Sequence, residues 1–279
     1  MKINLKIIHN LLILISLHTV KAYSQSNVLD GPYIKQNSQE RKVIPYTYLR
    51  EADIMWSRRI WRKVDMREKI NHVFYYPDQR IQGRKSMMQL IYDGITQDGT
   101  ITAYADDNEG DFTDVLTKSD VESRLNKIDT LQVENPDGTI ETKIVPSKFD
   151  PSKVKEFKIK EDWFFDKQRS IMECRIIGIA PIIEEEKGGE LRKTTMFWIY
   201  FPEARIIFAN AEIFNRQNDA ERRTYEDVFW KRQFNSYIYK ENNVYDRKIT
   251  EYRQGMDELL EAERAKNDMF NFEHDMWEY

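Results

Sequence analysis

The chain has 279 residues with 43 basic and 47 acidic side chains, so its formal net charge is −4. The two signs are interspersed, which excludes the concentrated basic surface that a nucleic-acid partner requires. Aromatic residues make up 13% of the sequence and supply bulk for a packed core, which argues against a disordered chain.

Residues 1–24 have the pattern of a secretory signal peptide. Lys2 and Lys6 form a basic start, an apolar run covers 11–17, and small residues precede an expected cleavage site before Gln25. The apolar run is far shorter than the roughly 20 residues of a membrane-spanning helix. We therefore expect a soluble mature protein in the periplasm, with an uncleaved anchor as the alternative.

The mature sequence predicts an extended N-terminal arm and two α+β lobes. The arm covers 25–42, which is polar and without periodicity. A first lobe at 43–145 is followed by a proline-containing connector at 146–151 and by a second lobe at 152–279. The second lobe ends in an acidic helix over 255–271. Cys174 is the only cysteine and lies in an apolar segment, so we expect a buried, inert thiol and no intrachain disulfide.

The segment 49–77 is expected to carry the main interaction surface. Its apolar residues recur at three- and four-residue spacing and predict an amphipathic helix, with a stripe formed by Leu49, Ala52, Trp56, Ile60 and Val64. Other aromatic and arginine side chains lie outside this stripe, and Trp and Arg often anchor protein interfaces. The interface candidates are Arg58, Trp61, Arg62, Phe74, Tyr75 and Tyr76. A place for Trp61 in a second core layer remains the alternative.

Local signals predict short helices and antiparallel hairpins in the rest of the chain. Capping boxes are expected at Ser86–Gln89, Ser119–Glu122 and Thr224–Asp227. Gly94 is expected to end the first of these helices. The turn at 135–138 contains proline and glycine and predicts a hairpin between 131–134 and 139–145. Further strands are expected at 100–104, 154–160, 170–183 and 194–201.

A short internal similarity relates the two predicted lobes. The sequence DIMWSR at 53–58 resembles DVFWKR at 227–232, and apolar positions continue to match downstream. Such a match favours two related helices that present the same face, although chance similarity between amphipathic helices explains it equally well. Paired faces of this kind would let subunits meet head to tail and close into a ring.

The sequence contains no recognisable catalytic or cofactor-binding constellation. Only His72 and His274 remain after the signal peptide, too few for a zinc triad. His72 is expected to be a packing residue. The acidic loop at 106–111 is rich in oxygen ligands, but it departs from the spacing of calcium-binding loops, so a solvated turn is the better account. We expect no enzyme, cofactor or metal. A hydrolase with an unrecognised carboxylate pair and a calcium- or ligand-binding module on this loop are the alternatives.

Three long strings resemble the GldN/PorN family of gliding-motility and type IX secretion proteins. They are VLDGPYIKQNSQERKVIPYTYLREADIMWSRRIWRKVDMREKINHVFYYP, YDGITQDGTITAYADDNEGDF and ERAKNDMFNFEHDMWEY. The resemblance implies a non-enzymatic periplasmic subunit of the secretion machinery of Bacteroidota, peripherally associated with the outer membrane. It also implies a ring complex with an outer-membrane lipoprotein of the GldK/PorK type, and contact with the periplasmic part of a motor protein of the GldM/PorM type. The family supplies no catalytic residues.

Overall fold

The structure is a computed structural model that describes residues 41–276, except 82, 108, 126–127, 135–139, 147–148, 188–189, 216–217 and 219. The chain divides into two compact units, 1–37 and 38–279, and all described residues belong to the second unit. The predicted signal peptide and nearly all of the predicted arm therefore lie outside the described residues.

The described residues form two antiparallel sheets and several helices, which confirms the α+β class. The strands are β1 (Ile54–Asp65), β2 (Ala103–Tyr104), β3 (Val115–Leu116), β4 (Ile128–Glu134), β5 (Ile140–Pro146), β6 (Val154–Asp166), β7 (Ile171–Lys187), β8 (Glu190–Thr195), β9 (Trp198–Tyr200) and β10 (Tyr237–Glu241). The α-helices are α2 (His72–Tyr75), α3 (Met87–Thr96), α4 (Lys118–Leu125), α5 (Phe201–Asn210), α6 (Tyr225–Trp230) and α7 (Met256–Asp275). Short 3-10 turns are η1 (Glu51–Asp53), η2 (Lys69–Asn71), η3 (Pro151–Lys153) and η4 (Ile249–Glu251).

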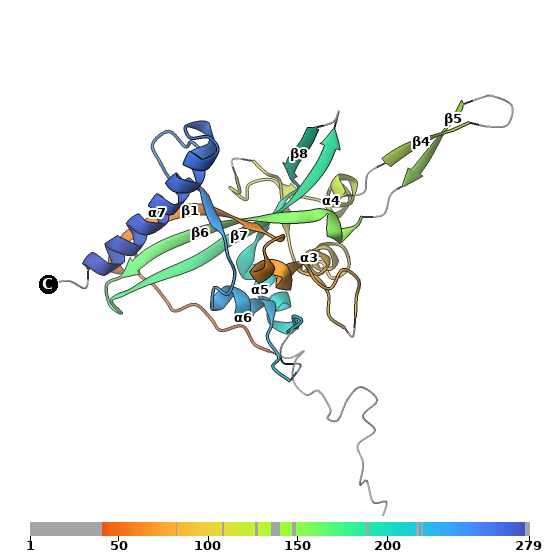
Figure 1. Cartoon of the computed structure of the whole chain (residues 1–279). Coiled ribbons are helices and arrows are strands. Elements are labelled where there is room, and N and C mark those ends of the chain that lie inside the picture. Colours follow the sequence, from red (N-terminus) through yellow and green to blue (C-terminus); the bar gives the residue numbers. More distant parts are fainter. Residues whose placement is uncertain are drawn as a thin grey trace, which may run out of the picture. The chain divides into compact units, whose positions relative to one another are not determined.

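Strands from both predicted lobes join in one eight-stranded sheet, with the order β10-β1-β6-β7-β9-β2-β3 and β8 paired to β7. β1, from the first half of the chain, lies between β10 and β6 from the second half (Figure 1). The main sheet therefore contains strands from both sides of the connector at 146–151. The predicted hairpin is confirmed for its strands, because β4 and β5 pair in register from Ile128↔Pro146 to Glu134↔Ile140. Its turn at 135–138 lies outside the described residues.

The helix predicted through 49–64 is wrong, because residues 54–65 form β1. The apolar residues Trp56, Ile60 and Val64 are spaced by four, and this spacing puts side chains on one face of a strand as well as of a helix. β-Branched and aromatic residues favour the strand. Hydrogen-bonding partners on both edges, β10 and β6, decide the outcome.

The internal similarity between 53–58 and 227–232 is not a structural repeat. Residues 54–58 belong to β1, whereas residues 227–230 belong to α6 and Arg232 follows its end. Six residues with apolar and polar positions in the same order therefore adopt different backbones, because their surroundings differ. The ring inferred from paired helical faces loses this support.

Two of the three predicted capping boxes are confirmed. Ser86 caps α3 with Gln89, and Thr224 caps α6 with Asp227, each with side-chain hydrogen bonds in both directions. The third lies two residues earlier than predicted, since Thr117 and Asp120 exchange bonds at the start of α4. α3 also continues past Gly94 to Thr96. Gly94 serves close packing instead, because a Cβ there would lie 2.8 Å from the Cδ1 atoms of Ile101 and Ile207.

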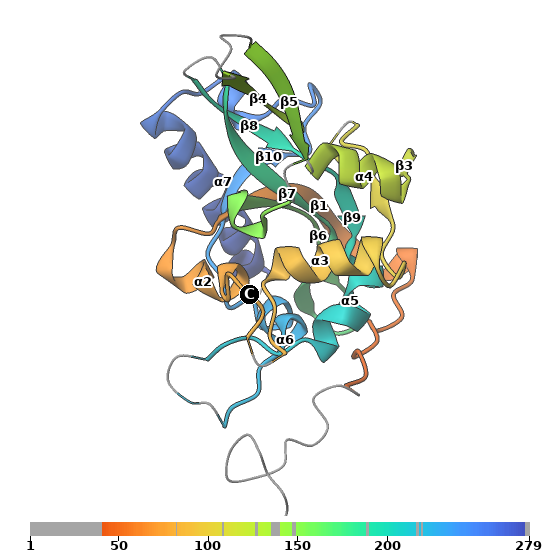
Figure 2. The same ribbon diagram turned by 90° about the vertical axis from the view of Figure 1, so that its right-hand side faces the viewer.

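Three clusters of buried side chains pack on the main sheet. The helices α3, α5 and α6 lie together on one side of the sheet (Figure 2). A large core joins them to the sheet, with Val64, Ile159 and Ile179 among its members. A smaller core on β1 and β10 packs against α7 through Ala262, Ala265 and Met269. A third cluster, which contains Trp61, Ala180, Trp198 and Tyr239, packs with Phe112 from the segment after β2.

Candidate interaction site

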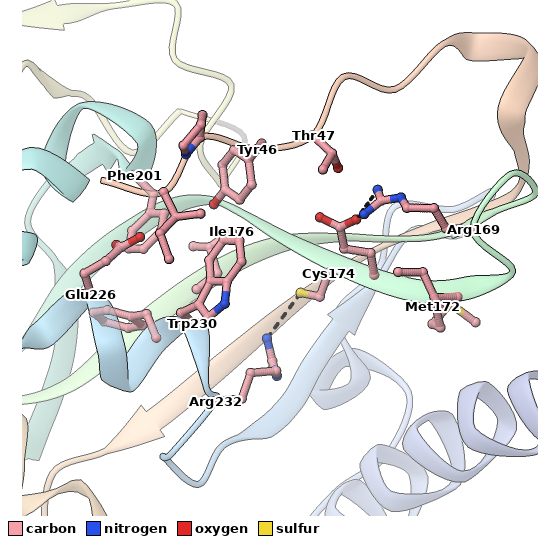
Figure 3. A pocket seen from close by; sticks show the side chains of 15 residues that line it. Tyr46, Thr47, Arg169, Met172, Cys174, Ile176, Phe201, Glu226, Trp230 and Arg232 are labelled. Carbon is pink, nitrogen blue, oxygen red and sulfur yellow. Dashed lines mark hydrogen bonds and ion pairs between the residues drawn. The ribbon is translucent and has the colours of Figure 1, made fainter. Parts of the chain in front are cut away.

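Residues 41–50, which we call the strap, have no regular secondary structure, and Tyr46 and Thr47 of this segment are labelled in Figure 3. The ring of Tyr46 contacts two guanidinium groups, with Cζ of Arg205 4.1 Å and Cζ of Arg175 5.0 Å from its centroid. It also stacks on Trp230 with the centroids 6.0 Å apart. Cation–π contacts of this kind are favourable, and more so when the cation is desolvated.

Direct hydrogen bonds fix the backbone of the strap at two points. Arg205 donates to the carbonyl oxygen of Ile44 over 2.7 Å, and Arg175 donates to that of Thr47 over 2.8 Å. Where the described chain begins, Arg41 forms an ion pair of 2.5 Å with Asp227, which completes the capping box of α6 with Thr224. The strap is therefore part of the folded unit.

A cavity of about 370 Å³ lies beside the strap and is lined by Tyr46, Cys174, Phe201, Glu226, Trp230 and Arg232, among others (Figure 3). Oε1 of Glu226 accepts two hydrogen bonds from Arg205, over 2.8 and 2.5 Å. Arg232 donates to Sγ of Cys174 over 3.2 Å. Cys174 is partly rather than fully buried. Desolvation still raises the pKa of its thiol well above the ordinary value, so it carries little thiolate.

A buried charge network lies behind this cavity. The carboxylate of Glu161 is fully buried and accepts hydrogen bonds from Arg62, Trp163 and Arg232. Burial by itself would raise the pKa of Glu161, but Arg232 and Arg62 outweigh it and hold this pKa below its ordinary value. Both guanidinium groups also contact the indole of Trp163, with Cζ of Arg232 5.0 Å and Cζ of Arg62 5.8 Å from the ring centroid. This network fixes β6 against β1 and α6. Because it holds the carboxylate of Glu161 in the ionised form, Glu161 is not available as a general acid or base.

Three of the predicted interface residues are buried inside the unit. Trp61 is 5% exposed, lies under the ammonium groups of Lys160 and Lys240, and donates a 3.0 Å hydrogen bond to the carbonyl of Glu109. Arg62 is 6% exposed and belongs to the network of Glu161. Phe74 is 1% exposed and stacks on Phe229. The sheet and the helices of the chain itself cover these three side chains.

Two other interface candidates are engaged within the chain. Arg58 forms an ion pair of 3.0 Å with Glu241 on the neighbouring strand, and its side chain is one-third exposed. Tyr75 packs at the edge of the large core and donates a hydrogen bond of 3.3 Å to the carbonyl of Ser152. Tyr76 is the candidate that remains exposed, at 44%.

Tyr76 lines a groove of about 850 Å³ that we call the Tyr76 groove. Its apolar lining is Ile70, Val73, Tyr76, Pro77, Ile81 and Phe214, and its polar lining is Lys69, His72, Asp78, Gln79, Asn215 and Arg223. Periodicity could not reveal this surface, since Ile70, Ile81 and Phe214 lie in three separate short turns and loops. Ile70 and Ile81 each stand between polar neighbours, whereas Phe214 follows the buried Ile213.

The acidic loop at 106–111 is a solvated turn only in part, because Asp107 and Asp111 are exposed while Glu109 and Gly110 are buried. Glu109 is 8% exposed and lies 3.6 Å from the ammonium groups of both Lys158 and Lys240, and 2.8 Å from that of Lys248. Lys160 donates to the carbonyl of Gly110 over 2.6 Å. Lysine ammonium groups thus occupy the places around the carboxylates that a cation would need, which argues against the calcium alternative. Within the part of the chain that the structure describes, no group of three or more His, Cys, Asp or Glu could hold a metal ion.

Among the described helices, none combines the length and the apolar composition needed to cross a membrane. His72 lies edge-on to Tyr76 with the ring centroids 5.6 Å apart, which fits its expected packing role.

No curated protein shows a significant sequence match to this chain. A family model described as gliding motility associated protein GldN matches residues 49–278, which is most of the sequence. The chain therefore belongs to the GldN family and takes part in gliding motility and type IX secretion.

Proposed function

We propose that the chain is a non-enzymatic structural subunit of a periplasmic ring complex associated with the outer membrane. In this role it links an outer-membrane lipoprotein of the GldK/PorK type to the periplasmic part of a motor protein of the GldM/PorM type. The family match and the expected export signal support the compartment and the machinery. The contacts of individual residues with these two partners are also proposals.

One observation carries the structural role: two separate apolar surfaces are exposed on the same unit. The first is the Tyr76 groove, whose side chains of Ile70, Tyr76, Ile81 and Phe214 are 44% to 58% exposed. The second is the outer face of α7 around Met256, Leu259 and Leu260, which are 51% to 70% exposed. Apolar surfaces of this kind mark protein interaction sites, because leaving them in water is unfavourable.

Co-purification of the exported full-length protein tests this role. A tagged chain should bring down the lipoprotein and the periplasmic part of the motor protein, and native mass measurement should give an assembly of many subunits. Cells that lack the chain should lose gliding and secretion of type IX substrates. The proposed function would be wrong if the chain bound neither partner and if cells without it still glided and secreted type IX substrates.

A further inference from the structure

We infer that the two exposed apolar surfaces bind each other between copies of this chain: the start of α7 of one copy occupies the Tyr76 groove of the next. The contact joins different surfaces of the two copies and is therefore head to tail. It rests on the proposed role as a subunit of a multi-copy assembly, and it supplies the surfaces that such an assembly needs.

The shape of the α7 surface suits a groove. Met256, Leu259 and Leu260 are spaced by three and four residues, so they form one ridge along the helix. The side of α7 that packs on the sheet carries different residues, Ala262 and Ala265, which are buried against Ile60 and Ile238. Binding of the ridge to a second copy would therefore leave the packing of α7 on its own sheet intact.

The groove offers a matching apolar floor. Ile70 comes from η2, Tyr76 and Ile81 from the turn after α2, and Phe214 from the segment between α5 and α6. Its volume of about 850 Å³ is large enough to accept several aliphatic side chains at once. An amphipathic helix that lays its apolar ridge into a hydrophobic groove is a recurrent mode of recognition.

The charges of the two surfaces are complementary. Residues 256–263, MDELLEAE, contain four acidic and no basic side chains. The groove is lined by Lys69 and Arg223, against a single carboxylate, that of Asp78. Opposite charges at the rim speed association and select the correct partner surface. The same charges disfavour contact of one α7 ridge with another, so they favour the head-to-tail arrangement over a symmetric one.

Complementary variants test the arrangement directly. Leu260→Glu places a charge on the apolar ridge and leaves the groove intact. Ile81→Glu places a charge in the apolar groove and leaves the ridge intact. Each variant of the full mature chain, followed by sedimentation over a concentration series, should self-associate at least tenfold more weakly than the parent. An equimolar mixture of the two variants should form dimers and no larger species, because each pair of chains has only one intact ridge and one intact groove. Val115→Glu, on the exposed strand β3, is the matched control and should associate like the parent.

Cysteine cross-linking supplies a second readout that does not depend on loss of binding. In a Cys174→Ser background, chains with Ile81→Cys should form a disulfide with chains that carry Leu260→Cys, and neither should cross-link to itself as efficiently. Circular dichroism of each variant checks that the fold is retained.

Three outcomes would overturn the inference. The first is a parent chain that stays monomeric at all concentrations. The second is a groove variant that associates like the parent. The third is a groove variant that loses only its binding to the lipoprotein, which would assign the groove to that partner. In each case co-purification with the lipoprotein and the motor protein, and gliding of the cells, still test the proposed function separately.

Discussion

Arg232 donates two hydrogen bonds to the fully buried carboxylate of Glu161, from Nη1 to Oε1 over 3.0 Å and from Nη2 to Oε2 over 3.2 Å. Arg62 approaches the same carboxylate from β1, with its Nε 3.1 Å from Oε2. Residues 71 and 99 positions apart in the sequence thus meet at one side chain. This contact ties the turn after α6 to two adjacent strands, and so it links the cavity beside the strap to the centre of the sheet.

Replacing Glu161 by leucine should strongly destabilise the protein. The change leaves the guanidinium groups of Arg62 and Arg232 without their carboxylate in a buried place, and breaking such a pair costs about 3–5 kcal/mol. Urea unfolding measures this as a fall in the free energy of unfolding. Glu263→Leu removes an exposed carboxylate on α7 that pairs with Lys266, and it should change stability by about 0.5 kcal/mol or less. Equal effects of the two changes would contradict a special role for the buried network.

The contribution of Glu161 should depend on pH in a defined direction. Its pKa in the folded protein lies below the ordinary value of the unfolded chain, about 4.3. The stabilisation is therefore complete above the unfolded pKa and is lost as the pH falls toward the folded pKa. We expect the difference in unfolding free energy between the parent and Glu161→Gln to be largest at neutral pH and to shrink below about pH 4. Urea titrations between pH 7 and pH 3 measure it, and a difference that stays constant would show that the charge of Glu161 is not responsible.

Tyr46→Ala should loosen the strap while the sheet stays folded. The substitution removes the ring that Arg175 and Arg205 contact, an interaction of about 1–2 kcal/mol, which corresponds to roughly a tenfold change in opening of the strap. Limited trypsin digestion after Lys42 should become faster by about this factor. Tyr48→Ala, in the same strap but with its side chain 89% exposed, should leave the cleavage rate unchanged. If both variants are cut alike, Tyr46 does not anchor the strap.

Gly178→Ala should destabilise the sheet locally. A Cβ at this position of β7 would overlap the ring of Phe112 and lie 3.2 Å from the carbonyl oxygen of Ile199. Extra volume in a packed core typically costs about 1–3 kcal/mol. The fluorescence of Trp198 reports the displacement, since its ring lies edge-on to Phe112 with the centroids 6.3 Å apart.

A double-mutant comparison separates the steric cause from other effects of Gly178→Ala. Shortening Phe112 to leucine in the alanine background should recover part of the lost unfolding free energy, because it makes room for the new methyl group. Additive losses from the two substitutions would show that contact with Phe112 is not the cause.

Structural elements that depend on residues close together in the sequence could be predicted well. The capping boxes at Ser86 and Thr224 form as expected, because their hydrogen bonds close within three residues. The strands flanking 135–139 pair as expected, and the long β-branched run around Ile176 and Ile179 is a strand. The α+β class follows from these local elements. Of the six predicted interface residues, only Tyr76 lines the Tyr76 groove, because the other apolar residues of this groove come from separate turns and loops.

Sequence alone thus determined the class of the fold, its main hairpins and the family. Only the tertiary structure decided that β1 is a strand and which of its side chains are buried. The four-residue spacing of Trp56, Ile60 and Val64 fits a helix and a strand equally, and the hydrogen-bonding edges of β6 and β10 select the strand. Trp61 and Arg62 look like surface anchors because tryptophan and arginine are common in interfaces. They are buried here since distant residues, Glu109 for Trp61 and Glu161 for Arg62, supply the hydrogen bonds and charge that burial requires.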